Sequence, residues 1–184
     1  ENSIMRTTLL PAMLEALGRN FSRGAAKVRA FEIGNTFFDI PTEEGLPTER
    51  ESLCIAAYGE DEDFFTVKGL TVRTLEQVGV RELEFVADTA IGAFHPGRSA
   101  RILSRGREIG AIGEIHPDIL ETYGIAARAC ACLLEFDSVV ELADTRRYYS
   151  PLPKYPAMAR DIALLVEDGV SVAEAEHVHL QSVP

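Results

Sequence analysis

Two stretches of the chain carry apolar residues at the three- and four-residue spacing of an amphipathic helix. The stripe of the first stretch consists of Leu10, Leu14, Leu17 and Phe21. Thr8 and Pro11 suit the start of this helix, and Gly24 suits its end. The second stretch, residues 64–78, repeats the spacing and is followed by Gly79. We therefore expect a helix in each stretch.

The remaining apolar segments are short and rich in β-branched and aromatic residues, which predicts strands at 27–38, 53–58, 83–86, 100–103, 108–115 and 130–136. The first contains Gly34, so it is either one long strand with a bulge or two strands that turn there. Composition predicts a loop at 41–50, a turn at 95–99, a hairpin turn at 105–106 and short helices at 117–123 and 138–142. Because the strands mostly follow one another through turns, we expect an α+β fold with an antiparallel sheet flanked by helices.

The character of the chain changes near its end. Residues 143–159 contain three prolines, Pro151, Pro153 and Pro156, and show no periodic spacing of apolar residues. We therefore expect an extended linker. After it, residues 161–166 are predicted to form a strand, and Ser171 is placed to cap a helix. One strand and one helix bury too little surface to fold alone. We therefore interpret residues 160–184 as the start of a second domain.

The net charge of -11 argues against a nucleic-acid-binding protein that contacts phosphates over its whole surface. Residues 41–63 account for much of it, with eight acidic residues against one arginine. The basic residues that do cluster are Arg146, Arg147, Lys154 and Arg160. They are candidate contacts to a nucleic-acid backbone, although a linker with charged flanks explains them equally well. No run of 18 apolar residues occurs, so we expect no membrane span and no membrane partner.

Few residues suggest chemistry of their own. Cys130 and Cys132 alternate along a predicted strand, so we expect both sulfurs to face the core. The three cysteines of the chain fit a reducing, cytoplasmic setting. His177 and His179 have no neighbours to complete a metal site. Glu108, Glu114 and Asp118 are the carboxylates considered for catalysis, and we expect them to be solvated on a hairpin and its flank.

Six motifs follow one another in the chain: MRTTLLPAMLEAL (5–17), VRAFEIGNTF (28–37), FFTVKG (64–69), HPGRSA (95–100), IGAIGEIHP (109–117) and KYPAMARDIAL (154–164). In this order and at these separations they closely resemble the beta subunits of bacterial phenylalanyl-tRNA synthetases. The resemblance runs from Ile4 to about Glu176. Because the chain begins without Met, we expect it to be a C-terminal fragment of such a subunit.

The resemblance implies a class II synthetase-like module at 1–142, a linker at 143–159 and the start of a ferredoxin-like anticodon-binding domain at 160–184. The family's enzyme is a cytoplasmic heterotetramer of two alpha and two beta subunits. It attaches phenylalanine to its tRNA with ATP and Mg²⁺. The implied partners of this chain are therefore the alpha subunit and, through the full beta chain, tRNA. The implied role is to pack against the alpha subunit and to position the C-terminal tRNA-binding domain.

A working class II site needs arginines and magnesium around ATP. Residues 29–32 match the class motif of arginine and glutamate, but no glycine-rich segment that ends in arginine follows. We therefore predict no catalytic, cofactor-binding or metal-binding residue in this chain. The candidate subunit contacts are Arg29, Glu32, His95 and Arg98, for which a strand ion pair and a structural turn are the plainer explanations. The alternative functions are an autonomous RNA-binding module and a remnant ATP-binding class II-like enzyme.

Overall fold

The computed structural model describes residues 4–146, 161, 163–167, 169–170 and 172. The chain divides into two compact units, Glu1–Arg147 and Tyr148–Pro184. The helices and strands reported below belong to the first unit. Within the described part of the chain, no helix combines the length and the apolar character needed to cross a membrane.

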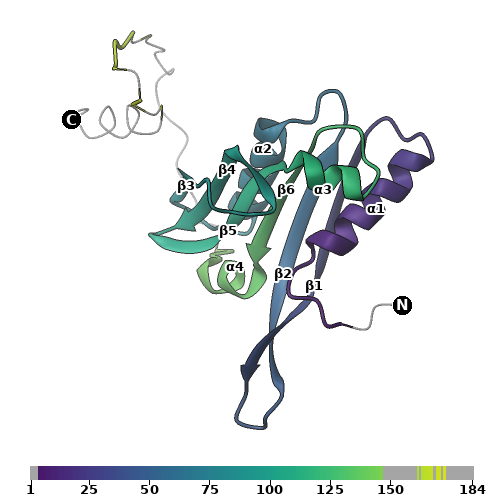
Figure 1. The fold of residues 1–184 in the computed structure, drawn as a ribbon. Helices are drawn as coiled ribbons and strands as arrows, with labels where there is room; N and C mark the ends of the chain where they lie inside the picture. Colours follow the sequence, from purple (N-terminus) through teal and green to yellow (C-terminus); the bar gives the residue numbers. More distant parts are fainter. Residues whose placement is uncertain (1–3, 147–160, 162, 168, 171, 173–184) are drawn as a thin grey trace. The chain divides into compact units, whose positions relative to one another are not determined.

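The first unit is built on one six-stranded sheet in the order β1-β2-β6-β5-β4-β3 (Figure 1). Its strands are β1 (Val28–Pro41), β2 (Pro47–Tyr58), β3 (Leu83–Ala87), β4 (Phe94–Ser104), β5 (Arg107–Ile115) and β6 (Ala129–Glu135). Every neighbouring pair is antiparallel, which confirms the predicted sheet. β1 is one strand, since Gly34 pairs with Ser52 and the register shifts only between Phe38 and Pro41.

Helices cover both faces of this sheet. Helices α1 (Leu10–Ser22) and α3 (Pro117–Thr122) pack on one face, in a core that includes Leu14, Tyr58 and Leu120. Helices α2 (Phe64–Gln77) and α4 (Phe136–Leu142) pack on the other face, in a second core. Cys130 and Cys132 belong to that second core, so the prediction that both face inward is confirmed. The central strands are thus buried on both sides.

The predicted loop at 41–50 is wrong over its second half. The turn is confined to residues 42–46, where the Thr42 N–H donates to the Leu46 carbonyl at 2.8 Å. From Pro47 onward the chain belongs to β2 and pairs with the end of β1. Tertiary pairing overrides the polar composition here, and the Arg50 guanidinium lies 5.0 Å from the centre of the Phe38 ring.

The predicted turn at 95–99 lies inside β4, so that prediction is also wrong. The register between β4 and β5 shifts between Phe94 and Ser99, and this irregularity accommodates the Pro-Gly pair within the strand. The Ser99 hydroxyl fixes the segment by donating to the Asp88 carbonyl at 2.6 Å. Pro and Gly here mark a strand irregularity, because pairing continues on either side of them.

The described residues of the second unit do not form the predicted strand. Residues 161 and 163–166 carry no strand pairing. A strand forms only against a neighbouring strand, and the described residues of this unit supply none. Most of the predicted linker lies outside the described residues, and so does most of the helix expected from Ser171. The same is true of His177 and His179.

Candidate functional site

Glu62 is a buried carboxylate in the connection between β2 and α2. Its side chain is fully buried, and it binds Lys27 Nζ at 2.5 Å and Arg29 Nη2 at 2.9 Å. The side chains of Lys27 and Arg29 are each about half exposed. Burial acts to raise the pKa of Glu62, but hydrogen bonds from Arg29 and Lys27 outweigh it and hold the pKa below its usual range. Glu62 is therefore an ionised group that compensates two basic side chains.

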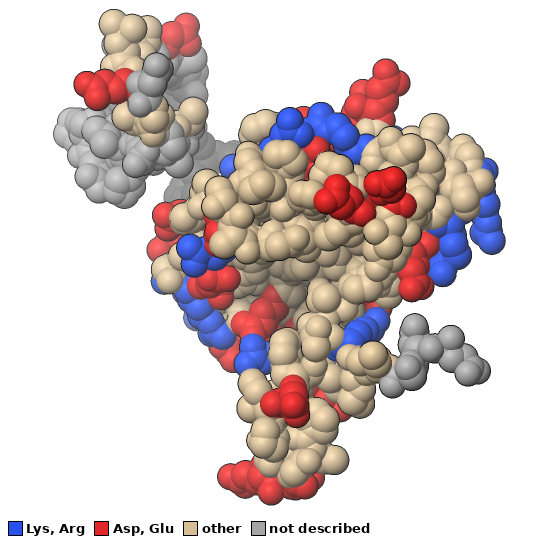
Figure 2. Space-filling view, in the orientation of Figure 1, with Lys and Arg blue, Asp and Glu red and all other residues tan. Residues whose placement is uncertain are grey.

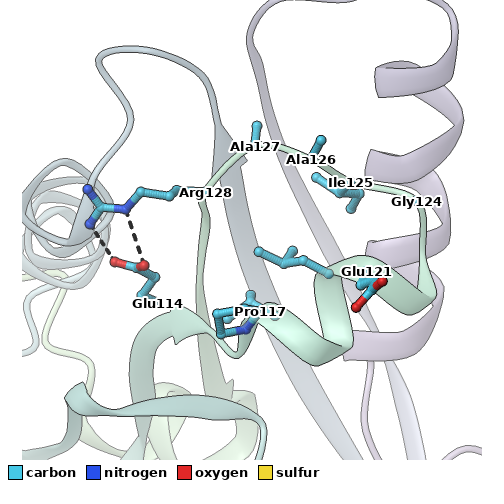
Figure 3. Close-up of a pocket in the computed structure, with 10 residues that line it drawn as sticks. Glu114, Pro117, Glu121, Gly124, Ile125, Ala126, Ala127 and Arg128 are labelled. Carbon is cyan, nitrogen blue, oxygen red and sulfur yellow. Dashed lines mark hydrogen bonds and ion pairs between the residues drawn. The ribbon is translucent and has the colours of Figure 1, made fainter.

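Glu114, near the end of β5, is a second carboxylate that binds two basic side chains. One comes from β4 and the other from the residue just before β6. Its carboxylate binds Arg98 Nη1 at 2.9 Å. It also binds Arg128 Nη2 at 2.5 Å (Figure 3). Burial acts to raise the pKa of Glu114, and the bonds and charges of Arg128 and Arg98 lower it below its usual range. The prediction that Glu114 is solvated is wrong, since only 4% of the residue is exposed. Both sheet faces are covered here, so strand alternation does not indicate exposure.

Glu108 and Asp118, the other two carboxylates considered from the sequence, are exposed as expected. Arg128 is a residue that the sequence reasoning missed. It immediately precedes β6 and has no neighbouring charge in sequence that would mark it. Its partner Glu114 lies 14 positions earlier, so only the pairing of β5 with β6 brings the two together.

Arg29 and Glu32 do not pair with each other, because residues three apart on a strand point to opposite faces. Arg29 binds Glu62, as described above. Glu32 binds Arg6 Nη1 at 2.6 Å, and Arg6 also donates through Nε to the Asn35 carbonyl at 2.9 Å. Each of the two residues therefore has an ion-pair partner within the chain, at a position that the sequence did not indicate.

His95 and Arg98 lie near the start of β4 but face different partners. The His95 ring stacks on His116 with centroids 6.4 Å apart, and its Nδ1 accepts from the Gly97 N–H at 3.1 Å. Arg98 binds Glu114. Of the candidate tRNA contacts, Arg146 forms an ion pair with Asp144 at 2.8 Å. Arg147, Lys154 and Arg160 lie outside the described residues.

Comparison with known families identifies the first unit. Residues 1–137 match the family described as the phenylalanyl tRNA synthetase beta chain CLM domain. The chain belongs to this family. The match covers all ten helices and strands of the first unit except the greater part of α4. Membership confirms the resemblance that the six sequence motifs indicated.

Curated relatives agree with the family. The chain is 38% identical over 176 residues to the phenylalanine–tRNA ligase beta subunit of Clostridium tetani, covering 96% of the chain and 22% of that protein. It is 35% identical to the beta subunit of Clostridium acetobutylicum, with the same coverage, and 37% identical to that of Moorella thermoacetica over 90% of the chain and 22% of the relative. The chain thus spans about a fifth of the length of these relatives.

Solved structures agree on the fold. A pyrrolysyl tRNA synthetase of Desulfitobacterium hafniense, PylSc, superposes with a TM-score of 0.60 at 17% identity, over 78% of this chain and 55% of that one. A second structure of the pyrrolysyl enzyme from the same organism gives a TM-score of 0.59 at 21% identity, over 73% of this chain and 48% of that one. The first unit therefore has a class II synthetase-like fold, as the sequence predicted.

Besides a hollow of about 520 Å³ lined by Glu76, Val80, Arg81, Glu82 and Leu83, two others open on the described part of the first unit. One, of about 400 Å³, lies beside α3 and is lined by Leu120 and Ile125, with Arg128 at one end (Figure 3). The other, of about 280 Å³, lies between the start of α1 and the sheet and includes Arg50. Arg128 binds Glu114, and Arg50 binds Glu135 at 3.0 Å. The described residues include no group of three or more His, Cys, Asp or Glu side chains arranged for a metal.

Proposed function

We propose that this chain is a non-catalytic, structural part of phenylalanine–tRNA ligase. It packs against the alpha subunit and positions the C-terminal tRNA-binding part of the beta chain. In this proposal the enzyme is cytoplasmic and heterotetrameric, and ATP, Mg²⁺, phenylalanine and tRNA are handled by the assembled enzyme. Residues 1–142 are the class II-like module, residues 143–159 the linker, and residues 160–184 the beginning of the anticodon-binding domain.

The observation that carries the non-catalytic assignment is that Arg50 and Arg128, each at one of the hollows, are bonded to carboxylates. A triphosphate carries several negative charges, so a site for it needs cations that are free to bind phosphate oxygens. Arg50 and Arg128 are each bonded to a carboxylate within the chain. Arg29, which matches the class motif, is likewise bonded to Glu62. These pairs favour a scaffold over a remnant ATP-binding enzyme.

The distribution of charge bears on the second alternative, an autonomous RNA-binding module. Acidic side chains gather at the tip of the β1–β2 hairpin (Figure 2), where Glu43 and Glu44 are exposed. This hairpin would repel a phosphate backbone. We propose that contact with tRNA belongs to residues from 143 onward, with Arg147, Lys154 and Arg160 as contacts. Arg146 joins them by exchanging its bond to Asp144 for one to phosphate. Arg29, Glu32, His95 and Arg98 stay proposed subunit contacts.

Co-expression tests the assembly role. The full-length beta subunit that contains this chain is expected to co-purify in constant stoichiometry with a tagged alpha subunit and to support aminoacylation. A beta subunit that elutes alone, while the alpha subunit is folded, contradicts the proposal.

Titration calorimetry of the full-length beta subunit separates the scaffold from the alternatives. We expect no saturable heat with ATP or phenylalanine, whereas the assembled enzyme gives heat with both. Saturable binding to the beta subunit alone, abolished by Arg50→Ala or Arg128→Ala, favours a remnant ATP-binding enzyme. Tight tRNA binding by the beta subunit that survives neutralisation of Arg146 and the later basic residues favours an RNA-binding module instead.

A further inference from the structure

Gly79, the second residue past the end of α2, is a buried glycine in a left-handed conformation with φ of 82°. Its N–H donates to the Glu76 carbonyl at 3.0 Å, and the Val80 N–H donates to the Leu75 carbonyl at 2.9 Å. These bonds are typical of a glycine that follows a helix. Gly24 holds the same position after α1 with the same φ of 82°, yet it is exposed. The end of a helix therefore does not explain why Gly79 is buried.

The backbone of Asp144, two residues past the end of α4, covers Gly79. A Cβ on Gly79 would overlap the Asp144 carbonyl oxygen and would lie 2.5 Å from the carbonyl carbon and 2.9 Å from the Asp144 nitrogen. A Cβ on Gly24 would meet no described atom within 4 Å. The left-handed φ is thus common to both glycines, whereas the close approach of a second backbone is a property of Gly79.

The segment that carries Gly79 is held in place from its other side. Val80 is fully buried in the second core, with 0% of its surface exposed. The hydroxyl of Ser104, at the end of β4, donates to the Arg81 carbonyl at 2.8 Å. Gly79 therefore belongs to a fixed surface, and Asp144 packs against that surface.

The residues that follow α4 are also bonded to one another. The Ala143 N–H donates to the Val140 carbonyl at 3.3 Å. The Asp144 carboxylate accepts the Arg146 N–H at 3.0 Å and the Arg146 guanidinium at 2.8 and 2.9 Å. Hydrogen bonds from Arg146, together with the charges of Arg146 and Arg81, lower the pKa of Asp144 to about 2. Residues 143–146 therefore form a closed turn whose backbone lies on Gly79.

We propose that residues 143–146, seated on Gly79, form a clasp that fixes the point at which the chain leaves the first unit. The linker then begins beyond Arg146 and is four residues shorter than the sequence predicts. Four extended residues reach about 14 Å, so an open clasp lets the C-terminal part range farther and lowers its effective concentration at bound tRNA. The inference rests on the proposed function, in which this chain positions the C-terminal tRNA-binding part, and it makes Gly79 and Asp144 positioning residues.

Three variants of the full-length beta subunit, assembled with the alpha subunit, test the clasp. Gly79→Ala places a methyl group against the Asp144 carbonyl. Gly24→Ala is the matched control, because it adds the same group at the same φ where no described atom lies within 4 Å. Asp144→Ala opens the turn by removing the acceptor for Arg146, and it leaves the end of α2 unchanged.

Hydrogen exchange measures whether the clasp is closed. We expect the Ala143 and Arg146 amides to exchange slowly in the wild type and in Gly24→Ala, and at least tenfold faster in Gly79→Ala. Asp144→Ala should speed both amides similarly without changing thermal unfolding. Rapid exchange in the wild type, or equal exchange in Gly79→Ala and Gly24→Ala, overturns the clasp. If Gly79→Ala does not fold, unchanged exchange in Asp144→Ala overturns it.

Aminoacylation kinetics test the positioning role. We expect the KM for tRNA to be at least threefold higher in Gly79→Ala than in Gly24→Ala, with kcat and the KM values for ATP and phenylalanine unchanged. An unchanged KM for tRNA with an open clasp, or an equal loss in all these constants, overturns the role. The proposed function fails separately, if the wild-type subunits do not assemble or if deleting the beta chain from residue 160 onward leaves the KM for tRNA unchanged.

Discussion

The Glu62 carboxylate binds the Arg29 guanidinium through both of its oxygens, with Nε lying 2.9 Å from Oε1 and 3.0 Å from Oε2. The two residues are 33 positions apart, one at the start of an edge strand and the other just before α2. The ion pair therefore links β1, the edge strand of the sheet, to the segment that leads into α2. The arginine in this pair, Arg29, is the one that resembles the motif arginine of class II synthetases, and its guanidinium is bonded to Glu62.

Replacing Glu62 with Gln is expected to lower the free energy of unfolding by about 1–3 kcal/mol at neutral pH. The substitution keeps the shape but removes the charge that compensates Lys27 and Arg29, and both cations are half exposed, which limits the loss. Urea unfolding of the chain measures the effect. Glu108→Gln, at an exposed carboxylate, is the control and should change the same quantity by less than about 0.5 kcal/mol.

The stability of the first unit is expected to fall in acid through Glu62 and Glu114. Both have a pKa below the usual range in the folded chain, so each favours folding above the unfolded pKa of about 4.3. That contribution is lost as the pH falls from there through the lowered folded pKa. The chain carrying Gln at both positions should lose less stability between neutral pH and about pH 3 than the wild type. An identical loss in the two proteins contradicts the ion-pair assignment.

Two helical glycines are expected to respond in opposite directions to alanine. A Cβ at Gly18 in α1 would lie 2.5 Å from the Tyr123 carbonyl oxygen, so Gly18→Ala should destabilise the chain by about 1–3 kcal/mol. A Cβ at Gly69 in α2 meets no atom within 4 Å, so Gly69→Ala should stabilise it by about 0.5–1 kcal/mol. Thermal unfolding of both variants measures this, and the same sign for the two would contradict the close packing of α1 on residue 123.

The three cysteines are expected to be unreactive in the folded chain. Burial raises the pKa of Cys54, Cys130 and Cys132 to about 12, so the nucleophilic thiolate is scarce at mildly alkaline pH. A thiol-specific dye should label none of them in buffer and all of them in concentrated urea. Rapid labelling of the native chain would show that the core of the sheet opens readily.

The sequence specified the elements whose signals are local. The spacing of Leu10, Leu14 and Leu17 predicted α1. The helix ends at Ser22, just before Gly24, which takes a left-handed conformation with φ of 82°. The hairpin turn at Arg105 and Gly106 was also predicted from the sequence, and in the structure both residues take positive φ. The start of β2 and the start of β4 were mispredicted, because cross-strand pairing holds residues there that their composition would leave in loops.

The sequence by itself also determined the family, because six motifs in fixed order carry that information without any geometry. What only the tertiary structure decided is which charges meet and what is buried. Glu114 appeared solvated from its strand position, yet helices on both faces bury it and the pairing of β4, β5 and β6 delivers Arg98 and Arg128 to it. Arg98 and Arg128 lie 16 and 14 positions away from Glu114 in the chain. No local sequence pattern encodes these contacts, because they form only when the strands pair.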